Sequence, residues 1–399
     1  MGKLFGTDGI RGIVGENLTV ELAFHVGQAV AAVLTEEKGS KPTITIGKDT
    51  RISSDMLEAA LMAGICSVGG DVMPLGTIPT PAVAYLTVLE QADAGIVISA
   101  SHNPYEHNGI KVFNARGYKL SDESEARVEE LILSGAPMDV KTHGEIGKRL
   151  HGMRQMKRDY IDHLISSIDC DLSGLRVLVD CANGASYKVA PLALEELGAE
   201  VVRIGTEPNG VNINDHVGAL HPETMASKVR EVRADVGIAL DGDADRLIMA
   251  DEHGNILDGD QIMAMCAQDL MDREQLPGNA ICATVMSNIA LEIYMKEHGG
   301  KLLRSKVGDR YVMEMMRREG IMFGGEQSGH LIFRSYSTTG DGLLSALQVL
   351  RILREKEKPL SEISHLLTLF PQKLVNVHVE KKLPFEERPA IGEAVKKVE

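Results

Sequence analysis

Short apolar runs alternate with amphipathic segments through most of the chain, a pattern typical of α/β proteins. Apolar side chains at the alternate positions Ile44 and Ile46 predict a short strand. From Ser54 onward, apolar residues recur at helical spacing until Gly69, which predicts a helix that ends near this glycine. Another helix is predicted from the leucines spaced through residues 343–353.

A βαβ unit is predicted between residues 177 and 204. Residues 177–179 form an apolar run typical of a buried strand, and an Asn183-Gly184 turn follows it. A helix then extends to about Leu197, and residues 201–204 predict the next strand.

With 399 residues, the chain exceeds what one hydrophobic core normally organises, so several domains are expected. A charged, glycine-containing and non-periodic segment at residues 144–152 predicts a boundary near residue 150. Weaker signals predict boundaries near residues 250 and 370. We therefore expect α/β domains at residues 1–150, 151–250 and 251–370, followed by a segment at 371–399.

Charge and composition exclude several classes of protein. Acidic residues outnumber basic ones by 57 to 42, which argues against nucleic-acid binding and against a basic membrane-binding patch. No apolar run reaches the ~18–20 residues that a membrane span needs, and the N-terminus lacks a signal-peptide core. The five cysteines are scattered without a C-x-x-C pair, as expected of reduced thiols. We expect a cytoplasmic protein without nucleic-acid or membrane partners.

The first loop with candidate chemistry holds Ser101. An apolar strand at residues 96–98 would deliver this serine to its carboxyl end, where α/β sheets bind ligands. His102 and Pro104 would hold the serine in place. A serine becomes reactive only beside a base, a metal or a strong acceptor, and a plain polar turn is the alternative interpretation.

The second loop carries three carboxylates, Asp241, Asp243 and Asp245, directly after the apolar run 236–240. Carboxylates at alternate positions repel one another unless a cation lies between them, and such ligands suit Mg²⁺, Mn²⁺ or Ca²⁺ rather than zinc. Arg246 is placed to bind a phosphate bridged by that metal. We expect the carboxylates in a solvent-facing loop. A solvated acidic turn is the alternative.

An EF-hand calcium loop is the nearest competing motif for these carboxylates. Counting from Asp241, positions 1, 3, 5 and 12 are acidic. However, position 6 is Arg246, where the sharp turn of an EF-hand needs glycine, and the preceding segment reads as a strand. We therefore reject the EF-hand.

The third loop, residues 324–330, reads Gly-Gly-Glu-Gln-Ser-Gly-His. Its glycines would let the backbone approach a ligand, and Glu326, Ser328 and His330 offer groups that bind sugar hydroxyls. A glycine-rich β-turn without a ligand is the alternative.

The fourth loop places Arg11 among glycines in residues 5–12, where it could reach a phosphate. A surface turn is the default interpretation of such a segment. Neither G-x-x-x-x-G-K-[ST] nor G-x-G-x-x-G occurs, which disfavours nucleotide binding.

Together, in this order and spacing, the four loops resemble the α-D-phosphohexomutase superfamily over essentially the whole chain. The resemblance implies three consecutive α/β domains, with mixed sheets flanked by helices, around a central cleft, and the start of a fourth, α+β domain. It implies that Ser101 carries the phosphoryl group and that Lys111 is a general acid/base. It further implies one Mg²⁺ held by Asp241, Asp243, Asp245 and the Ser101 phosphate, a sugar-reading loop at Glu326 and Ser328, and a cleft lined by Arg11 and His102. We therefore expect catalytic roles for His102 and Arg246 beside Ser101 and Lys111. The residues expected to bind substrate are Arg11, Glu326, Ser328 and His330.

Residues 5–11, 99–104 and 325–330 resemble the phosphoglucosamine mutase branch of this superfamily, from which relatives acting on mannose and glucose phosphates usually differ at Ala100 and Gln327. This implies interconversion of glucosamine 6-phosphate and glucosamine 1-phosphate, with glucosamine 1,6-bisphosphate as intermediate and activator, for UDP-N-acetylglucosamine and cell-wall synthesis. Gln327 or His330 would then meet the 2-substituent. The expected partner is a sugar phosphate, and a homodimer is left open.

The chain departs from the family at its end. The family's fourth domain normally carries an Arg-x-Ser-Gly-Thr-Glu-Pro loop, which this sequence lacks. A strand is expected at residues 374–379 and a helix at the very end, so we expect a chain truncated in its fourth domain. The rival hypotheses are a phosphomannomutase/phosphoglucomutase, a non-catalytic sugar-phosphate-binding relative, and a phosphoserine phosphatase.

Overall fold

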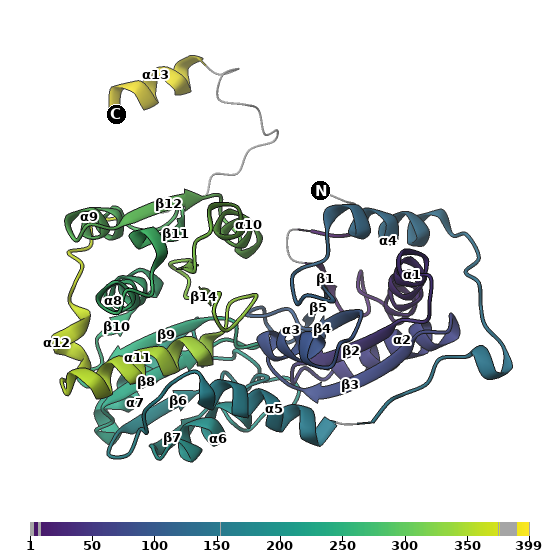
Figure 1. Cartoon of the computed structure of the whole chain (residues 1–399), viewed down its shortest axis with the longest axis horizontal. Helices are drawn as coiled ribbons and strands as arrows, with labels where there is room; N and C mark the ends of the chain where they lie inside the picture. Colours follow the sequence, from purple (N-terminus) through teal and green to yellow (C-terminus); the bar gives the residue numbers. More distant parts are fainter. Residues whose placement is uncertain (1–3, 7–8, 152, 374, 376–388, 399) are drawn as a thin grey trace. The chain divides into compact units, whose positions relative to one another are not determined.

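Three β-sheets of five, five and four strands, each flanked by helices, make up most of the computed structural model (Figure 1). The structure describes residues 4–6, 9–151, 153–373, 375 and 389–398. It divides into two units, Met1–Thr368 and Leu369–Glu399, and the three sheets belong to the first. The predicted α/β class with mixed sheets is confirmed.

The first sheet has the strand order β1-β5-β4-β2-β3. Strands β2, β3 and β4 are parallel, whereas β5 is antiparallel to both β4 and β1. The strands are β1 (Ile10–Ile13), β2 (Thr43–Lys48), β3 (Asp71–Thr77), β4 (Ala94–Ile98) and β5 (His107–Asn114). The helices are α1 (Val20–Lys38), α2 (Ser54–Ser67), α3 (Thr80–Leu89) and α4 (Asp122–Ser134), followed by a 3₁₀ turn at His143–Glu145.

Both faces of this sheet are covered, which explains the continuous apolar run in β4. Ile96 and Ile98 belong to the core formed with α1 and α2. Val97 points the other way, into the core that contains Val83 of α3. Successive strand residues face opposite sides of a sheet, so a strand buried on both faces needs apolar residues throughout. The strand and helix predicted at Ile44 and Ser54 are β2 and α2.

The second sheet has the order β10-β9-β8-β6-β7. The predicted βαβ unit is confirmed, because β6 and β7 are parallel and α6 connects them. The expected boundary near residue 250 lies close to the turn between β9 and β10, so β10 still belongs to this sheet. The strands are β6 (Arg176–Asp180), β7 (Glu200–Ile204), β8 (Val236–Leu240), β9 (Leu247–Asp251) and β10 (Ile256–Leu257), and the helices are α5 (Met153–Ser166), α6 (Val189–Glu196) and α7 (Pro222–Val232).

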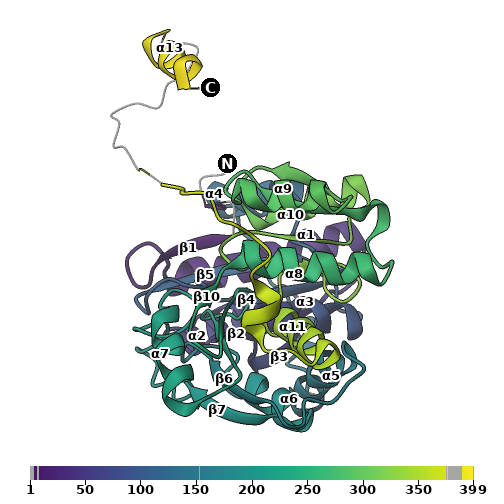
Figure 2. The same cartoon turned by 90° about the vertical axis from the view of Figure 1, so that its left-hand side faces the viewer.

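The third sheet has the order β12-β11-β13-β14. Its strands are β11 (Ala280–Thr284), β12 (Lys301–Ser305), β13 (Phe323–Gly325) and β14 (Leu331–Phe333). The helices are α8 (Gly259–Asp272), α9 (Ile289–Glu297), α10 (Asp309–Glu319), α11 (Gly342–Lys356) and α12 (Leu360–Ser364), with a 3₁₀ turn at Pro277–Asn279. Figure 2 shows α11, the helix predicted from its leucines, beside α5. An apolar core formed by residues of all three sheets and of α11 joins the sheets.

The three sheets repeat one topology that the sequence does not reveal as a repeat. In each, a central strand lies between two parallel neighbours, and the next strand is antiparallel to the second of these neighbours. The connection into that antiparallel strand is the Ser101 loop between β4 and β5. In the second and third sheets it is the Asp241 loop between β8 and β9 and the Glu326 loop between β13 and β14. Three of the predicted loops therefore occupy equivalent positions.

The second unit contains α13 (Pro389–Val398), which is the helix expected at the end of the chain. Most of the strand expected at residues 374–379 lies outside the described residues, and Val375, the one described position, is not in a strand. Among the described helices, none has the length and apolar character to cross a membrane.

A buried hydrogen bond links α5 to α11. The hydroxyl of Tyr160 donates to Asp341 Oδ2 at 2.9 Å, and Asp341 Oδ1 caps α11 by accepting from the Leu344 N–H at 3.0 Å. Burial raises the pKa of Asp341 to about 6, although both hydrogen bonds favour the charged form. The Tyr160 hydroxyl therefore helps to keep a charged carboxylate in the core above this pH.

We predict that Tyr160→Phe lowers the free energy of unfolding by roughly 1–3 kcal/mol, because a buried acceptor loses its donor. The pKa of Asp341 is raised in the folded state, so its charge opposes folding as the pH rises through about 6. The cost of the substitution should thus be larger at pH 8 than at pH 5 in urea denaturation.

Tyr85→Phe is the matched control, since this half-buried tyrosine of α3 makes no hydroxyl hydrogen bond within the described chain. Equal losses in the two variants, or a loss at Tyr160 that does not change with pH, would contradict the role given to this hydrogen bond.

Candidate active site

Three loops from the three sheets meet at one point. Ser101 Oγ donates to Asp241 Oδ2 at 2.6 Å, which joins the first loop to the second. His330 Nδ1 lies 3.6 Å from Asp245 Oδ2, which joins the third loop to the second. A backbone bridge between Arg246 and His330 strengthens the second contact. The structure therefore brings together loops that the sequence predicts separately.

Ser101 lies at the carboxyl end of β4, as predicted, and is only 2% exposed. Its Oγ is 3.2 Å from His102 Nδ1. Burial, together with the nearby guanidinium groups of Arg246 and Arg11, lowers the pKa of His102 to about 4. The imidazole beside Ser101 is therefore neutral at neutral pH, and positive charge near the serine comes from the arginines.

The three carboxylates form a tight cluster, with one oxygen from each of Asp241, Asp243 and Asp245 within 4.8 Å of the others. Their exposed fractions are 0%, 1% and 5%, so the expectation of a solvent-facing loop was wrong. The cover comes partly from α3, whose Thr80 hydroxyl donates to Asp243 Oδ2 at 2.6 Å. Such a contact joins residues far apart in the chain, and a loop sequence cannot reveal it.

The pKa values of Asp241 and Asp245 are shifted in opposite directions. Burial, followed by the charges of Asp243 and Asp245, raises the pKa of Asp241 well above its usual value. Burial also favours the neutral form of Asp245, but His330 and Lys111 outweigh it and hold the pKa of Asp245 far below its usual range. Positive groups therefore keep Asp245 in its charged form, whereas burial and the neighbouring carboxylates favour the neutral form of Asp241.

Two oxygens of the cluster favour a bound cation. Asp243 Oδ1 and Asp245 Oδ1 are buried and accept no hydrogen bond from the described residues. Lys111 Nζ lies near the other oxygens of these carboxylates, 3.6 Å from Asp243 Oδ2 and 3.7 Å from Asp245 Oδ2. A buried acceptor without a donor is costly, and hard carboxylate oxygens suit Mg²⁺, Mn²⁺ or Ca²⁺. The residues therefore fit a hard divalent cation.

Glycine lets the second loop approach the first closely. A Cβ on Gly242 would lie 2.5 Å from the carbonyl oxygen of Ser101. On the other side, a Cβ on Gly184 would lie 2.3 Å from the carbonyl oxygen of Gly242. Three backbone segments therefore stack in direct contact, and this stacking sets the short distance from Ser101 to Asp241.

Basic side chains border the cluster. Arg11 on β1 lies opposite Gly109 on β5, two positions from Lys111, so Arg11 and Lys111 project from the same face of the sheet. Burial alone would lower the pKa of Arg246, but the surrounding carboxylates raise it. Arg11, Lys111 and Arg246 thus supply the positive charge that an anionic ligand needs. Thr7 and Asp8 of the fourth loop lie outside the described residues.

The third loop is held mainly by its own side chains. Glu326 Oε1 accepts from the Gly308 N–H at 3.0 Å, and Gln327 Nε2 donates to Asp258 Oδ2 at 3.2 Å. His330 is 3% exposed, and its Nε2 accepts from a backbone N–H at 3.1 Å. Ser328 is exposed. Gln327 and His330, the residues expected to meet the sugar's 2-substituent, are thus engaged with protein groups.

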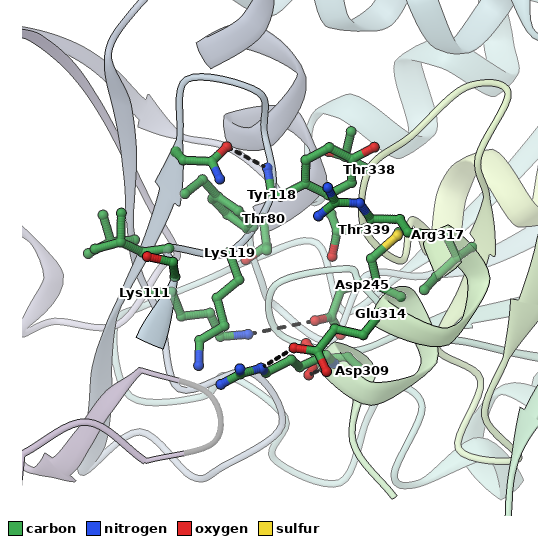
Figure 3. Close-up of a pocket in the computed structure, with 18 of the residues that line it drawn as sticks. Thr80, Lys111, Tyr118, Lys119, Asp245, Asp309, Glu314, Arg317, Thr338 and Thr339 are labelled. Atoms are coloured by element: carbon green, nitrogen blue, oxygen red, sulfur yellow. Dashed lines mark hydrogen bonds and ion pairs between the residues drawn. The ribbon is translucent and has the colours of Figure 1, made fainter. Parts of the chain in front are cut away.

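A cavity of about 270 Å³ opens between β5 and α10 and reaches Lys111, Asp245 and His330. Figure 3 shows Lys111 and Lys119 on one side of it, facing Asp245, Asp309 and Glu314 on the other. The segment that supplies Asp309 was not predicted from the sequence. It follows strand β12, and the rule that ligands bind at carboxyl ends of parallel strands could have indicated it.

Comparison with known proteins assigns the chain to a family. Its residues 2–137, 158–254 and 258–370 match, in turn, the profiles of the α/β/α domains I, II and III of phosphoglucomutase/phosphomannomutase. A phosphoglucosamine mutase of Desulfovibrio desulfuricans is 60% identical over 401 residues, covering 100% of this chain and 89% of the relative. One of Nitratidesulfovibrio vulgaris is 57% identical, with the same coverage. The chain belongs to the phosphoglucosamine mutase family of the phosphohexomutase superfamily.

Solved structures agree with this assignment. A phosphoglucomutase/phosphomannomutase family protein of Burkholderia thailandensis has a TM-score of 0.79 at 27% identity, covering 92% of this phosphohexomutase and 80% of that chain. An N-acetylphosphoglucosamine mutase of Aspergillus fumigatus, solved with GlcNAc-6P and magnesium, shares the fold at 18% identity, with a TM-score of 0.68 and coverage of 100% and 87%. The family resemblance read from the loops is confirmed, and the phosphomannomutase/phosphoglucomutase alternative is not favoured.

We predict that Asp243→Asn weakens Mg²⁺ binding to this phosphohexomutase at least about tenfold, because even groups that only orient a metal ligand cost that much when lost. Without metal, its melting temperature should rise, since repulsion within the cluster falls while Thr80 can still donate to the amide oxygen. Calorimetric titration with MgCl₂ and thermal melts in EDTA measure the two effects.

Asp215→Asn serves as control, because it removes the same charge from a side chain that is 64% exposed and outside the cluster. Unchanged Mg²⁺ affinity in Asp243→Asn would reduce the three aspartates to a structural turn.

Proposed function

We propose that the chain interconverts glucosamine 6-phosphate and glucosamine 1-phosphate, supplying UDP-N-acetylglucosamine and cell-wall synthesis. The observation that carries the proposal is the 2.6 Å contact between Ser101 and Asp241 within a buried carboxylate cluster that fits a divalent cation. Its relatives of 51–60% identity are named phosphoglucosamine mutases, which supports the choice of sugar.

Two phosphoryl transfers make up the proposed reaction. In the first, the bond from phosphorus to Ser101 Oγ breaks and a bond to the free sugar hydroxyl forms, giving glucosamine 1,6-bisphosphate. The hydroxyl's proton leaves through Lys111, and Ser101 Oγ ends protonated. After the bisphosphate turns round, its other phosphate returns to Ser101 by the reverse exchange. Protons and phosphates balance over the cycle. Glucosamine 1,6-bisphosphate is the intermediate, and because it can also phosphorylate free Ser101 it acts as the activator.

The residues around Ser101 suit such transfers, which depend on position and charge more than on covalent catalysis. Arg11, His102 and Arg246 would bind the phosphates, and Lys111 lies close enough to the cluster to move the proton. Glu326 and Ser328 would hold the ring hydroxyls. The 2% exposure of Ser101 favours transfer to a bound sugar over transfer to water, which argues against a phosphatase.

We further propose that Asp241, Asp243 and Asp245, with the Ser101 phosphate, hold one Mg²⁺ per chain. When bound, the cation would neutralise negative charge on the phosphoryl group. The A. fumigatus enzyme solved with magnesium supports this choice of metal. A non-catalytic relative would not need all these groups, so their joint presence favours an enzyme.

Ser101 is predicted to be partly phosphorylated in the purified protein. Intact mass should show a species heavier by one phosphate, and treatment with glucose 1,6-bisphosphate should increase it. Ser101→Ala should abolish both this species and turnover.

Ser328→Ala is the control for this experiment, because it removes an exposed serine of the third loop and leaves Ser101 in place. It should keep the heavier species. Persistence of that species in Ser101→Ala would show that another residue carries the phosphate.

The choice of sugar leads to a separate prediction. The chain should transfer phosphate from Ser101 to glucosamine 6-phosphate with about ten- to a hundredfold higher kcat/KM than to glucose 6-phosphate. A preference of this size corresponds to one buried polar contact. Single-turnover loss of the phosphate from Ser101, followed by mass, measures it for each sugar. Equal values would overturn the glucosamine assignment but not the phosphohexomutase one.

A further inference from the structure

The backbone of Ser101 has a φ of +52°, in the left-handed region that residues other than glycine rarely adopt. Such a conformation persists only where surrounding groups hold it. On one side of the residue, the Ser101 N–H donates to Ser99 Oγ at 3.0 Å. On the other side, the carbonyl oxygen of Ser101 accepts hydrogen bonds from two side chains outside the loop.

The first of these side chains is Arg51, which is 2% exposed. Its Nη2 donates to the carbonyl oxygen of Ser101 at 3.1 Å and to that of Asn103 at 2.5 Å. Its Nη1 pairs with Asp49, whose Oδ1 in turn accepts from the hydroxyl of Ser54 at 2.9 Å. The buried ion pair with Asp49 therefore fixes the guanidinium of Arg51, which donates hydrogen bonds to two carbonyl oxygens of the loop.

The second is Asn214, which comes from the connection between β7 and α7. Its Nδ2 donates to the same two carbonyl oxygens, at 3.0 Å to Ser101 and at 3.1 Å to Asn103. The side chain is 93% buried, since only 7% of Asn214 is exposed. The carbonyl oxygens of Ser101 and Asn103 thus each accept from Arg51, which follows β2 of the first sheet, and from Asn214, which follows β7 of the second.

We propose that Arg51 and Asn214 are positioning residues for phosphoryl transfer, an inference that rests on the proposed function. By fixing the peptide after Ser101 while Ser99 fixes the peptide before it, they set the direction of Cβ and aim Oγ at Asp241. Because Asn214 follows a strand of the second sheet and Ser101 a strand of the first, the direction of Ser101 Oγ also depends on how these two sheets lie against each other. Neither residue need touch the sugar phosphate.

The test uses protein loaded with phosphate from glucose 1,6-bisphosphate and then mixed with glucosamine 6-phosphate. In Asn214→Ala, the saturating rate of phosphate loss from Ser101 should fall about 10–100-fold, because misplacement by about 1 Å has effects of this size. The half-saturating sugar concentration should change less than about threefold, since the sugar-binding groups are intact. A merely structural role would instead lower the melting temperature and spare the rate.

Asn212→Ala is the matched control, because among the described residues its amide donates only to the carbonyl oxygen of Glu207 within the same connection. It should match Asn214→Ala in melting temperature and the wild type in rate. Arg51→Lys provides a second variant, since it keeps a cation beside Asp49 but replaces the forked guanidinium with one nitrogen. Its rate should also fall about tenfold or more.

The outcomes separate this inference from the proposed function. If the wild type transfers its phosphate normally and either variant does so within about twofold, the positioning role is wrong while the mutase proposal stands. If the wild type never takes phosphate onto Ser101, the proposed function fails, and the positioning role fails with it.

Discussion

Three carboxylates held close together away from water are the constraint on which the rest of the site depends. Burial raises the pKa of Asp241, and the nearby charges of Asp243 and Asp245 raise it further. The surrounding groups stabilise the carboxylates in different ways. Thr80 and Ser101 donate hydrogen bonds, and Lys111 and His330 approach as cations or dipoles. The protein thus supplies donors and positive charge to these carboxylates, and two of their oxygens, Asp243 Oδ1 and Asp245 Oδ1, accept no hydrogen bond from the described residues.

The common topology of the three sheets explains how distant segments reach this cluster. In each sheet, the connection from a parallel strand into the antiparallel one is short and starts from a buried strand. A short connection on a rigid base has few conformations, so the side chains it carries are aimed accurately. The connections carry different side chains: a serine in the first sheet, carboxylates in the second, and a glutamate, a serine and a histidine in the third.

Much of the fold and of the site could be predicted because the patterns that indicate them involve residues close together in the sequence. The apolar run before Ser101, the alternating aspartates from Asp241 and the βαβ pattern at residues 177–204 each concern neighbours in sequence. The contacts that the sequence analysis missed join residues far apart, as Thr80 does with Asp243 and Asn214 with Ser101. Likewise, nothing in the loop of Gln327 indicates its hydrogen bond to Asp258.

The stack of backbone at Gly184, Gly242 and Ser101 also bears on how such a chain can change over time. At these glycines a new Cβ would meet backbone atoms, which cannot move aside as the end of a flexible side chain can. A substitution there would therefore shift the main chain itself. Outer helix positions, by contrast, exchange freely as long as they stay polar. Substitutions are therefore expected to accumulate at surface positions. The geometry at Ser101 can persist in sequences that have diverged almost everywhere else.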